Sequence, residues 1–390
     1  MELPRGRCSG DERLAAPRRA EPRASGPLSG GQHRQVARLA RDLQGAPDRA
    51  ARRVIDFRLF DDLDAVEADA AHALDRVTQA SLYDRIEWLR AHARHGLAPG
   101  AAWIARARTD GATAWLFLAD EGRGRAAAFA SWYTLSFAPV WQGGDATDRA
   151  RLLRAIAGGL RGRFGRIVLA PLPADAVDAM ETAFAAAGWW VDRQESSANW
   201  VAHVAGEDFA TYWARRPSRL RNTARRKARD AGLEIAIHDG FDAAAWAAYE
   251  AVYAGSWKPN EGSPAFLREM AEREGAAGCL RLAVATREGR PVAAQMWTVE
   301  HGTATIHKLA YVETERARSP GTVLSEVMFR HVIERDCPAL IDFGTGDDAY
   351  KADWMDEKRP LYRLTLHDPR SVAGLAGAAR ARIARWRAAR

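Results

Sequence analysis

The stretch TATIHKLAYV-ETERARSPG-TVLSEVMFRHVIER, residues 303–335, decides the fold that we predict for this chain. It predicts a strand, a loop and a helix, with Ser319 as the N-cap and Pro320 as the first helical residue. Gly321 would let a ligand approach the backbone closely. Free N–H groups and the positive end of the helix dipole at such a turn favour phosphate. The stretch therefore predicts a phosphate-binding turn, and a well-capped helix without a ligand is the alternative interpretation.

Two successive parts of the chain show the same predicted order of elements. For the first part we expect strands at 57–60, 101–108, 112–119, 126–141, 166–172 and 189–192, with helices at 64–77, 84–95, 148–162 and 174–187. For the second part we expect helices at 209–215, 218–231, 242–255, 265–274 and 322–335, with strands at 233–239, 279–287, 291–300, 303–312, 339–344 and 361–368. The repeated order predicts a layered α/β fold of two tandem domains, each a mixed, mainly antiparallel sheet flanked by helices, at 54–206 and 207–368.

The charge of the chain is concentrated at its two ends. Residues 1–53 hold twelve Arg and six acidic residues, and residues 370–390 hold six Arg and no acidic residue. The two ends therefore carry a net charge of +12. Since the whole chain carries +7, the middle carries about −5. This distribution argues against a basic nucleic-acid-binding face on the folded part. We expect a disordered tail at 1–53 and an Arg/Ala-rich helix at 369–390.

The remaining compositional features favour a cytoplasmic protein. The longest apolar region, 126–141, contains polar residues and is too short for a membrane span. The three cysteines lie far apart and form no CxxC pair, which favours a reducing compartment. We expect no bound metal.

Several motifs in order resemble the GNAT acyltransferases. The sequence KLAYV followed by an R-x-x-G turn at Arg318–Gly321 is similar to the coenzyme A loop of that superfamily, although Val323 replaces the usual small residue. The segments SWK (256–258), LRNTARRKARD (220–230) and IDFGTGDDAYKADW (341–354) resemble the branch that contains CelD and BcsL proteins, which is close to the Fem-type transferases.

The resemblance implies where an acyl-CoA would bind. In such a fold the pantetheine arm lies along the last strand of the meander like an added strand. The implied cofactor-binding residues are Lys308, Leu309, Ala310, Tyr311, Arg318, Ser319, Pro320, Gly321 and Thr322. Strand alternation places Lys308 and Ala310 on one face and His307, Leu309 and Tyr311 on the other.

Direct acyl transfer needs a base for the amine and an acid for the thiolate. We assign Tyr350 as the acid for the thiolate or as a hydrogen-bond donor to the acyl oxygen, Asp347 as the base and Lys351 as a substrate or phosphate contact. His307 is an alternative base. A glycine-rich turn stiffened by Asp, and a structural histidine, are the alternative interpretations. A chain with 52 arginines keeps only five lysines, and this scarcity draws attention to Lys351.

The acceptor side is expected to involve polar and aromatic residues of several elements: Trp257, Lys258, Gln295, Asp342 and Trp354. For Lys308 we expect either an ion pair with Asp342 or a substrate contact, since an unpaired buried ammonium is costly. The helix around 219–229 carries six basic residues and no acid, which indicates either an anionic substrate such as tRNA or a solvated face.

The resemblance therefore predicts an N-acyltransferase that moves an acyl group, most simply acetyl, from acyl-CoA to an amine. The acceptor would be an amino sugar or another small amine of cell-envelope or exopolysaccharide metabolism. One alternative is a Fem-type transfer from aminoacyl-tRNA. Another is a catalytically silent tandem protein that binds a partner through its Arg-rich ends.

Overall fold

A computed structural model describes residues 54–230, 232–372 and 374–379. The described helices and strands belong to one compact unit that begins at Asp56. The tail predicted at 1–53 lies outside the described residues. Of the helix predicted at 369–390, residues 374–379 are helical, and residues 380–390 lie outside the described part.

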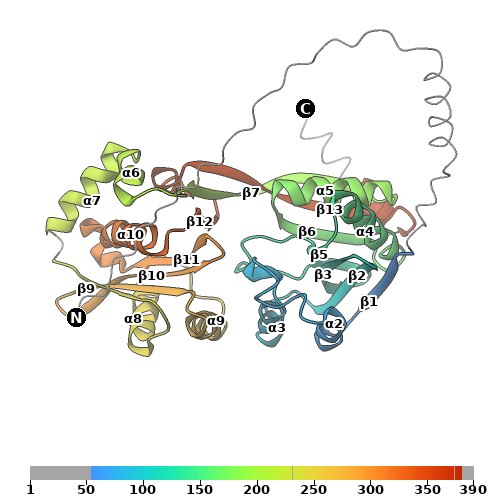
Figure 1. The fold of residues 1–390 in the computed structure, drawn as a ribbon, viewed down its shortest axis with the longest axis horizontal. Helices are drawn as coiled ribbons and strands as arrows, with labels where there is room; N and C mark the ends of the chain where they lie inside the picture. The colour runs from blue at the N-terminus through green and yellow to red at the C-terminus, as the bar shows by residue number, and fades with distance from the viewer. Residues whose placement is uncertain (1–53, 231, 373, 380–390) are drawn as a thin grey trace, which may run out of the picture. The chain divides into compact units, whose positions relative to one another are not determined.

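The first half of the chain, up to His203, is a mixed sheet with helices on both sides (Figure 1). Its strands are β1 (Asp56–Phe60), β2 (Ala101–Thr109), β3 (Ala112–Gly122), β4 (Arg125–Ala128), β5 (Val140–Gly143), β6 (Arg166–Leu172) and β7 (Trp190–His203). Its helices are α2 (Leu63–Ala70), α3 (Ile86–Arg94), α4 (Ala146–Gly159) and α5 (Ala174–Ala186), with a 3-10 turn η1 (Leu82–Asp84).

The second half repeats this order. Its strands are β8 (Glu234–His238), β9 (Leu280–Arg287), β10 (Arg290–Glu300), β11 (Thr303–Tyr311), β12 (Leu340–Thr345) and β13 (Glu357–His367). Its helices are α6 (Phe209–Ala214), α7 (Ser218–Asp230), α8 (Ala243–Ala254), α9 (Pro264–Ala276), α10 (Pro320–His331) and α11 (Lys351–Trp354), with short turns η2 (Glu313–Arg318) and η3 (Val332–Asp336).

The strands of both halves form one sheet in which the last strands are exchanged. The strand order is β1-β2-β3-β4-β6-β13-β7-β12-β11-β10-β9-β8, and β5 pairs with β3 outside this path. The last strand of the second half, β13, pairs with β6, while β7 of the first half pairs with β12. The halves are therefore tandem copies of one mixed, mainly antiparallel arrangement, and the predicted fold class is confirmed. The division at residue 206 stays a prediction.

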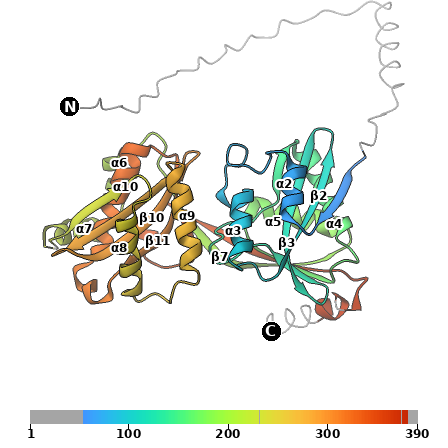
Figure 2. The same cartoon turned by 90° about the horizontal axis from the view of Figure 1, so that it is seen from below.

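In the second half the meander is buried on both faces. Helices α8 and α9 cover one face of β9–β11, and α10 covers the other (Figures 1 and 2). Seven consecutive residues of β10 are buried, Val292–Thr298, because α8 and α10 pack against its two faces. Tight turns at Glu288-Gly289 and His301-Gly302 join its strands, and all four residues have positive φ, as the twist of such hairpins requires.

Two predictions for the first half were wrong. The apolar run 126–141 is not one strand, since β4 ends at Ala128 and β5 begins at Val140. Between them Phe129, Tyr133 and Phe137 are buried by packing rather than by strand pairing. The helix predicted at 64–77 ends at Ala70, and the residues after it turn with positive φ. Hydropathy did not distinguish the loop between β4 and β5 because Phe129, Tyr133 and Phe137 are as buried as the residues of a strand.

Candidate active site

Strands β11 and β12 diverge and leave one edge of β11 unpaired. They pair in parallel only from Thr303 to Thr305 on β11. On the other edge, the pairing with β10 shifts register where Met296 pairs with Lys308 and Trp297 with Ile306, so His307 is the extra residue of a β-bulge. Backbone groups beyond Thr305 therefore face the gap between the two strands, where an extended ligand could pair with them.

Helix α10 starts beside this gap without a side-chain cap. Ser319 stands at the predicted N-cap position, but its φ of 53° is left-handed and its hydroxyl makes no capping bond. Pro320 is the first helical residue, as predicted. The Gly321 N–H has no hydrogen-bond acceptor among the residues that the structure describes. The positive end of the helix dipole is thus open to an anion.

A cavity of about 670 Å³, which we call the α10 cavity, lies over this helix start. Of the residues predicted to bind cofactor, Leu309, Tyr311, Ser319, Gly321 and Thr322 line it. Its opposite wall belongs to α7 and α11. Residues there that were not assigned from the sequence are Arg219, Leu220 and Thr223. A Cβ placed on Gly321 would lie 3.1 Å from Tyr311 Cδ1, so this position tolerates no larger side chain without a shift.

Four residues of the predicted cofactor set do not line the α10 cavity. Arg318 pairs with Glu315 at 3.2 Å, and Arg316 lines the cavity in its place. The side chains of Pro320 and Ala310 are buried. The remaining one, Lys308, lies on the face of β11 that the alternation predicted, opposite Leu309 and Tyr311. The prediction that His307 shares the face of Leu309 and Tyr311 was wrong, because the bulge turns its ring toward Thr298, on the face that also carries Lys308.

Tyr350 lies where two cavities meet. It lines the α10 cavity and also a smaller one of about 190 Å³ between β11 and β12, which we call the slot cavity. Its ring packs edge-on against Phe343 at 5.7 Å between centroids. Burial, with a smaller contribution from Asp348, raises the pKa of the phenol to about 12, so it stays protonated at neutral pH. This position suits a proton donor.

The other residues assigned to catalysis on the same segment have structural partners. The Asp347 carboxylate accepts hydrogen bonds from Trp200 Nε1 at 3.3 Å and Lys358 Nζ at 2.6 Å, and Lys358 lowers its pKa. Asp347 is exposed and lines neither cavity, which makes it unsuited as the base. The buried Lys351 ammonium donates to the carbonyls of Thr345, Phe343 and Gly346 at 2.7–3.3 Å, and so fixes the turn after β12.

His307 lines the slot cavity, but its ring is a weak base. Its Nε2 is 2.8 Å from Thr298 Oγ1. Burial, followed by the charge of Lys308, lowers the pKa of the imidazole to about 3. The structural interpretation of His307 is thus the better supported one, since a base should titrate near the working pH.

Lys258 is common to three cavities. It lines the α10 cavity, the slot cavity, and a third cavity of about 340 Å³ between α8 and α9, which we call the tyrosine cavity. Its Nζ forms no hydrogen bond or ion pair with the described residues. Burial, and then the charge of Lys308, lowers the pKa of the ammonium to about 8. Trp257 beside it is 58% exposed and lines the α10 cavity.

A loop of the first half completes this region. Lys308 pairs with Glu261 at 2.7 Å, not with Asp342, and its ammonium lies 4.8 Å from the centre of the Tyr133 ring. Tyr133 donates to Glu261 Oε1 at 2.5 Å and accepts from the Ser263 N–H at 2.9 Å. The loop between β4 and β5 thereby holds the α8–α9 loop in place, and its Trp132 and Leu135 line the slot cavity. No sequence signal identified these residues.

Of the other residues assigned to the acceptor, one lines a cavity and two do not. Trp354 lines the α10 cavity. Gln295 is buried, donates to Ser325 Oγ at 2.8 Å and accepts from Trp297 Nε1 at 2.9 Å, so its amide is satisfied in the core. Asp342 accepts from Asn199 Nδ2 at 2.7 Å, and burial raises its pKa. The α10, slot and tyrosine cavities include neither Gln295 nor Asp342.

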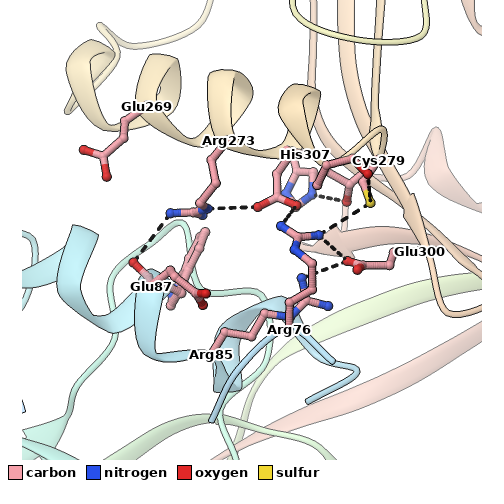
Figure 3. Close-up of polar contacts among 12 residues, drawn as sticks. Arg76, Arg85, Glu87, Glu269, Arg273, Cys279, Glu300 and His307 are labelled. Atoms are coloured by element: carbon pink, nitrogen blue, oxygen red, sulfur yellow. Dashed lines mark hydrogen bonds and ion pairs between the residues drawn. The ribbon is translucent and has the colours of Figure 1, made fainter. Parts of the chain in front are cut away.

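A buried ionic cluster joins segments from both halves (Figure 3). Arg76 donates to Glu274 at 2.6 Å, to Glu300 at 2.8 Å and to Cys279 Sγ at 3.5 Å. Arg85 also pairs with Glu300 at 2.8 Å. Within the described part of the chain, the two carboxylates and the thiol are the one group of three that lies close enough to hold a metal ion. The Arg76 guanidinium already bonds to all three, so the cluster is explained as an ionic junction.

The first half offers no matching anion site at its corresponding helix. Helix α4 follows the meander of the first half as α10 follows that of the second. Asp145 Oδ1 accepts the Asp148 N–H there at 2.8 Å and caps the helix. A carboxylate at this position would repel phosphate. The open helix start is thus a property of α10.

Comparisons with known proteins agree with this geometry. Residues 214–352 match the family model described as an acetyltransferase (GNAT) domain. No curated protein matches the chain. None of the helices in the described ranges has the length and apolar character needed to cross a bilayer.

Three solved structures share the fold. The C-terminal domain of a protein assigned as a lysylphosphatidylglycerol synthetase from Agrobacterium fabrum has a TM-score of 0.52 at 15% identity, over 81% of this chain and 95% of that one. A conserved protein of unknown function from Bacteroides thetaiotaomicron has a TM-score of 0.52 at 12% identity, and the match covers 80% of this chain and 100% of that one. FemX has a TM-score of 0.54 at 9% identity, and the match covers 73% of this chain and 92% of that one.

Proposed function

We propose that the chain is an acyltransferase that moves an acyl group from coenzyme A to a primary amine. The observation that carries the proposal is the uncapped start of α10 at the floor of the α10 cavity, next to the unpaired edge of β11. A diphosphate would bind at the helix start and the pantetheine arm would extend along β11. The cavity volume of about 670 Å³ lies within the usual range of ligand sites.

In the proposed reaction the neutral amine attacks the thioester carbonyl in the slot cavity. The C–N bond forms, the C–S bond breaks, and the departing sulfur receives the Tyr350 proton. The proton of the amine passes to Lys258, which is neutral in part at pH 7–8 because its pKa is about 8. Both side chains line the slot cavity, so the acid and the base can act on one bound complex.

The basic helix α7 favours a second candidate function, transfer from an aminoacyl-tRNA. Its basic residues are Arg219, Arg221, Arg225, Arg226, Lys227 and Arg229. Within the described ranges, Arg219 is the one that forms an ion pair, with Asp353 at 2.7 Å. Such a surface would attract a phosphate backbone. The acyl-CoA proposal ranks first because the α10 cavity fits a small ligand and Arg219 is the one basic residue of α7 that lines it.

An isotope experiment separates the two candidates. Purified protein is incubated with a set of primary amines and either radiolabelled acetyl-CoA or a radiolabelled aminoacyl-tRNA, with and without ribonuclease. We expect labelled amide that is insensitive to ribonuclease. Label transfer from aminoacyl-tRNA alone, abolished by ribonuclease, would support the second candidate instead. The same assay with residues 1–53 and 371–390 deleted tests the binding-protein alternative, since a catalyst should retain its turnover. The cytoplasmic, cell-envelope and exopolysaccharide setting and the CelD and BcsL branch stay predictions.

A further inference from the structure

One lysine of the chain has no partner for its ammonium group. All five lysines lie within the described residues. In four of them the ammonium lies against a carboxylate or a main-chain carbonyl: Lys227, Lys308, Lys351 and Lys358. The fifth, Lys258, lines three cavities, and its Nζ forms no hydrogen bond or ion pair with any described residue. An amine is a nucleophile only when it is neutral, and such partners hold the proton in place, so Lys258 is the lysine best placed to react.

The surroundings of Lys258 favour its neutral form. Its charge interacts with the ammonium groups of Lys308 and Lys351 and with the carboxylates of Glu261 and Asp348. Burial is the largest effect, followed by the charge of Lys308, and they lower the pKa of Lys258 from 10.5 to about 8. Glu261, which acts in the opposite direction, is already paired with Lys308 at 2.7 Å. At pH 8 about half of Lys258 is therefore neutral, against less than about 1% of an ordinary lysine.

Lys258 also lies where the reactive end of an acyl donor would lie. It lines the α10 cavity, where we propose that coenzyme A binds, and the slot cavity, where the thioester carbonyl would lie. Leu309 and Tyr350 are the two other residues that line both cavities. The Lys258 amine and the acid proposed for the departing sulfur thus share a slot of about 190 Å³. A nucleophile held beside its electrophile reacts as if it were present at a very high concentration.

We propose that Lys258 is itself an acyl acceptor, so that the protein acylates its own Lys258 when an acyl-CoA is bound and no amine is present. The proposal rests on the acyltransferase function above and adds a covalent modification site to it. The neutral Lys258 nitrogen attacks the thioester carbonyl, a C–N bond forms and the C–S bond breaks. The nitrogen releases one proton to solvent, and the sulfur receives the Tyr350 proton, which solvent replaces. The products are free coenzyme A and an Nε-acyl-lysine, and no further reactant is consumed.

Acylation of Lys258 stops the turnover of other amines. The nitrogen of an amide is not basic near neutral pH, so acylated Lys258 cannot accept the proton of an incoming amine. An acceptor amine in the slot cavity competes for the same acyl group and thereby protects Lys258. The modification therefore accumulates when acyl-CoA is abundant and the acceptor is scarce, and it links the activity of the protein to the supply of acceptor.

Mass spectrometry of the full chain, incubated at pH 8 with acetyl-CoA and without an amine, tests the proposal. We expect the mass to increase by one acetyl group, and fragment spectra to locate that group on Lys258. Lys258 should react at least about tenfold faster than each of the other four lysines. Protein unfolded in urea is the reference for the unassisted reaction, and its five lysines should react slowly and at similar rates. Equal modification of the five lysines in the folded protein would overturn the proposal.

Two variants check the site of modification. Lys258→Arg should not acquire the acetyl group at this rate, because a guanidinium stays protonated. Lys358→Arg is the matched control, because Lys358 is exposed, pairs with Asp347 and lines none of the α10, slot and tyrosine cavities. The control should gain the acetyl group as fast as the unmodified protein. Equal acetylation of Lys258→Arg and the unmodified protein would overturn the proposal.

Turnover of an amine that the labelled assay identifies separates this proposal from the function on which it rests. Turnover should fall in step with acetylation of Lys258, and a saturating amount of the amine should slow that acetylation. A protein that acetylates amines and leaves Lys258 unmodified refutes the self-acylation alone. A protein that acetylates neither an amine nor Lys258 refutes the acyltransferase function as well. Full turnover by fully acetylated protein would overturn the loss of activity and also the role of Lys258 as the base.

Discussion

Replacement of Tyr350 by Phe should remove most of the turnover and little else. The variant keeps the ring that packs against Phe343 at 5.7 Å, so the free energy of unfolding should change by less than about 1 kcal/mol. Only the hydroxyl is lost, and its proton is needed when charge develops on the departing sulfur. A positioned proton donor contributes about 10²–10⁴ in rate. We expect kcat to fall by at least about a hundredfold, or about 3 kcal/mol in activation free energy.

The assay is release of free thiol from acetyl-CoA under saturating amine, with calorimetry for coenzyme A on the same protein. The affinity for coenzyme A should stay within about twofold, because the hydroxyl acts on the transition state rather than on the bound donor. Tyr362→Phe is the control, since Tyr362 lies on β13 and packs against Arg193, not at the α10, slot or tyrosine cavities. A kcat for Tyr350→Phe within about threefold of the unmodified protein would refute the assigned role.

Three further predictions concern Lys258, His307 and Arg76. In a pH–rate profile, kcat/KM for the amine should rise with pH up to about 8, because Lys258 acts as a base only when it is neutral. Lys258→Arg should remove this rise with pH and most of the activity. Folding lowers the pKa of His307 from 6.5 to about 3, so the unfolded state binds the proton first as the pH falls. The free energy of unfolding should therefore drop by about 2 kcal/mol from pH 7 to pH 5, and by less in His307→Gln. Urea titrations at the two pH values will measure this. Arg76→Met leaves Glu274, which is 1% exposed, with a single arginine partner. Chemical denaturation should show that the free energy of unfolding falls by about 3 kcal/mol. A fall below about 1 kcal/mol would contradict the ionic junction.

Most elements of the fold were predictable because they carry a local signal. The turn at His301-Gly302 located the start of β11, and the Pro320–Gly321 pair located the start of α10 to within two residues. Exchange of β7 and β13 had no such signal, because partner choice depends on contacts between residues more than 150 positions apart, such as Val201 with Glu357. Local patterns cannot encode that choice.

The candidate site was predictable in part, for the same reason. Gly321 and Tyr311 follow from a motif and a strand face, and both line the α10 cavity. Tyr133 and Glu261 meet only after the two halves pack, and each looks like an ordinary loop residue in the sequence. Asp347 pairs with Lys358 and lines neither the α10 nor the slot cavity, and the sequence did not show this pairing.

The central claim is that the start of α10 binds the diphosphate of coenzyme A, and calorimetry of acetyl-CoA with a glycine variant tests it most directly. Gly321→Leu places a side chain against Tyr311 in the α10 cavity, whereas Gly158→Leu, at a position with no heavy atom within 4 Å of an added Cβ, is the matched control. The account predicts saturable binding to the unmodified protein and to the control, and a loss of at least about a hundredfold in affinity, about 3 kcal/mol, for Gly321→Leu. Equal affinity in all three proteins, or no binding to the unmodified protein, would contradict it.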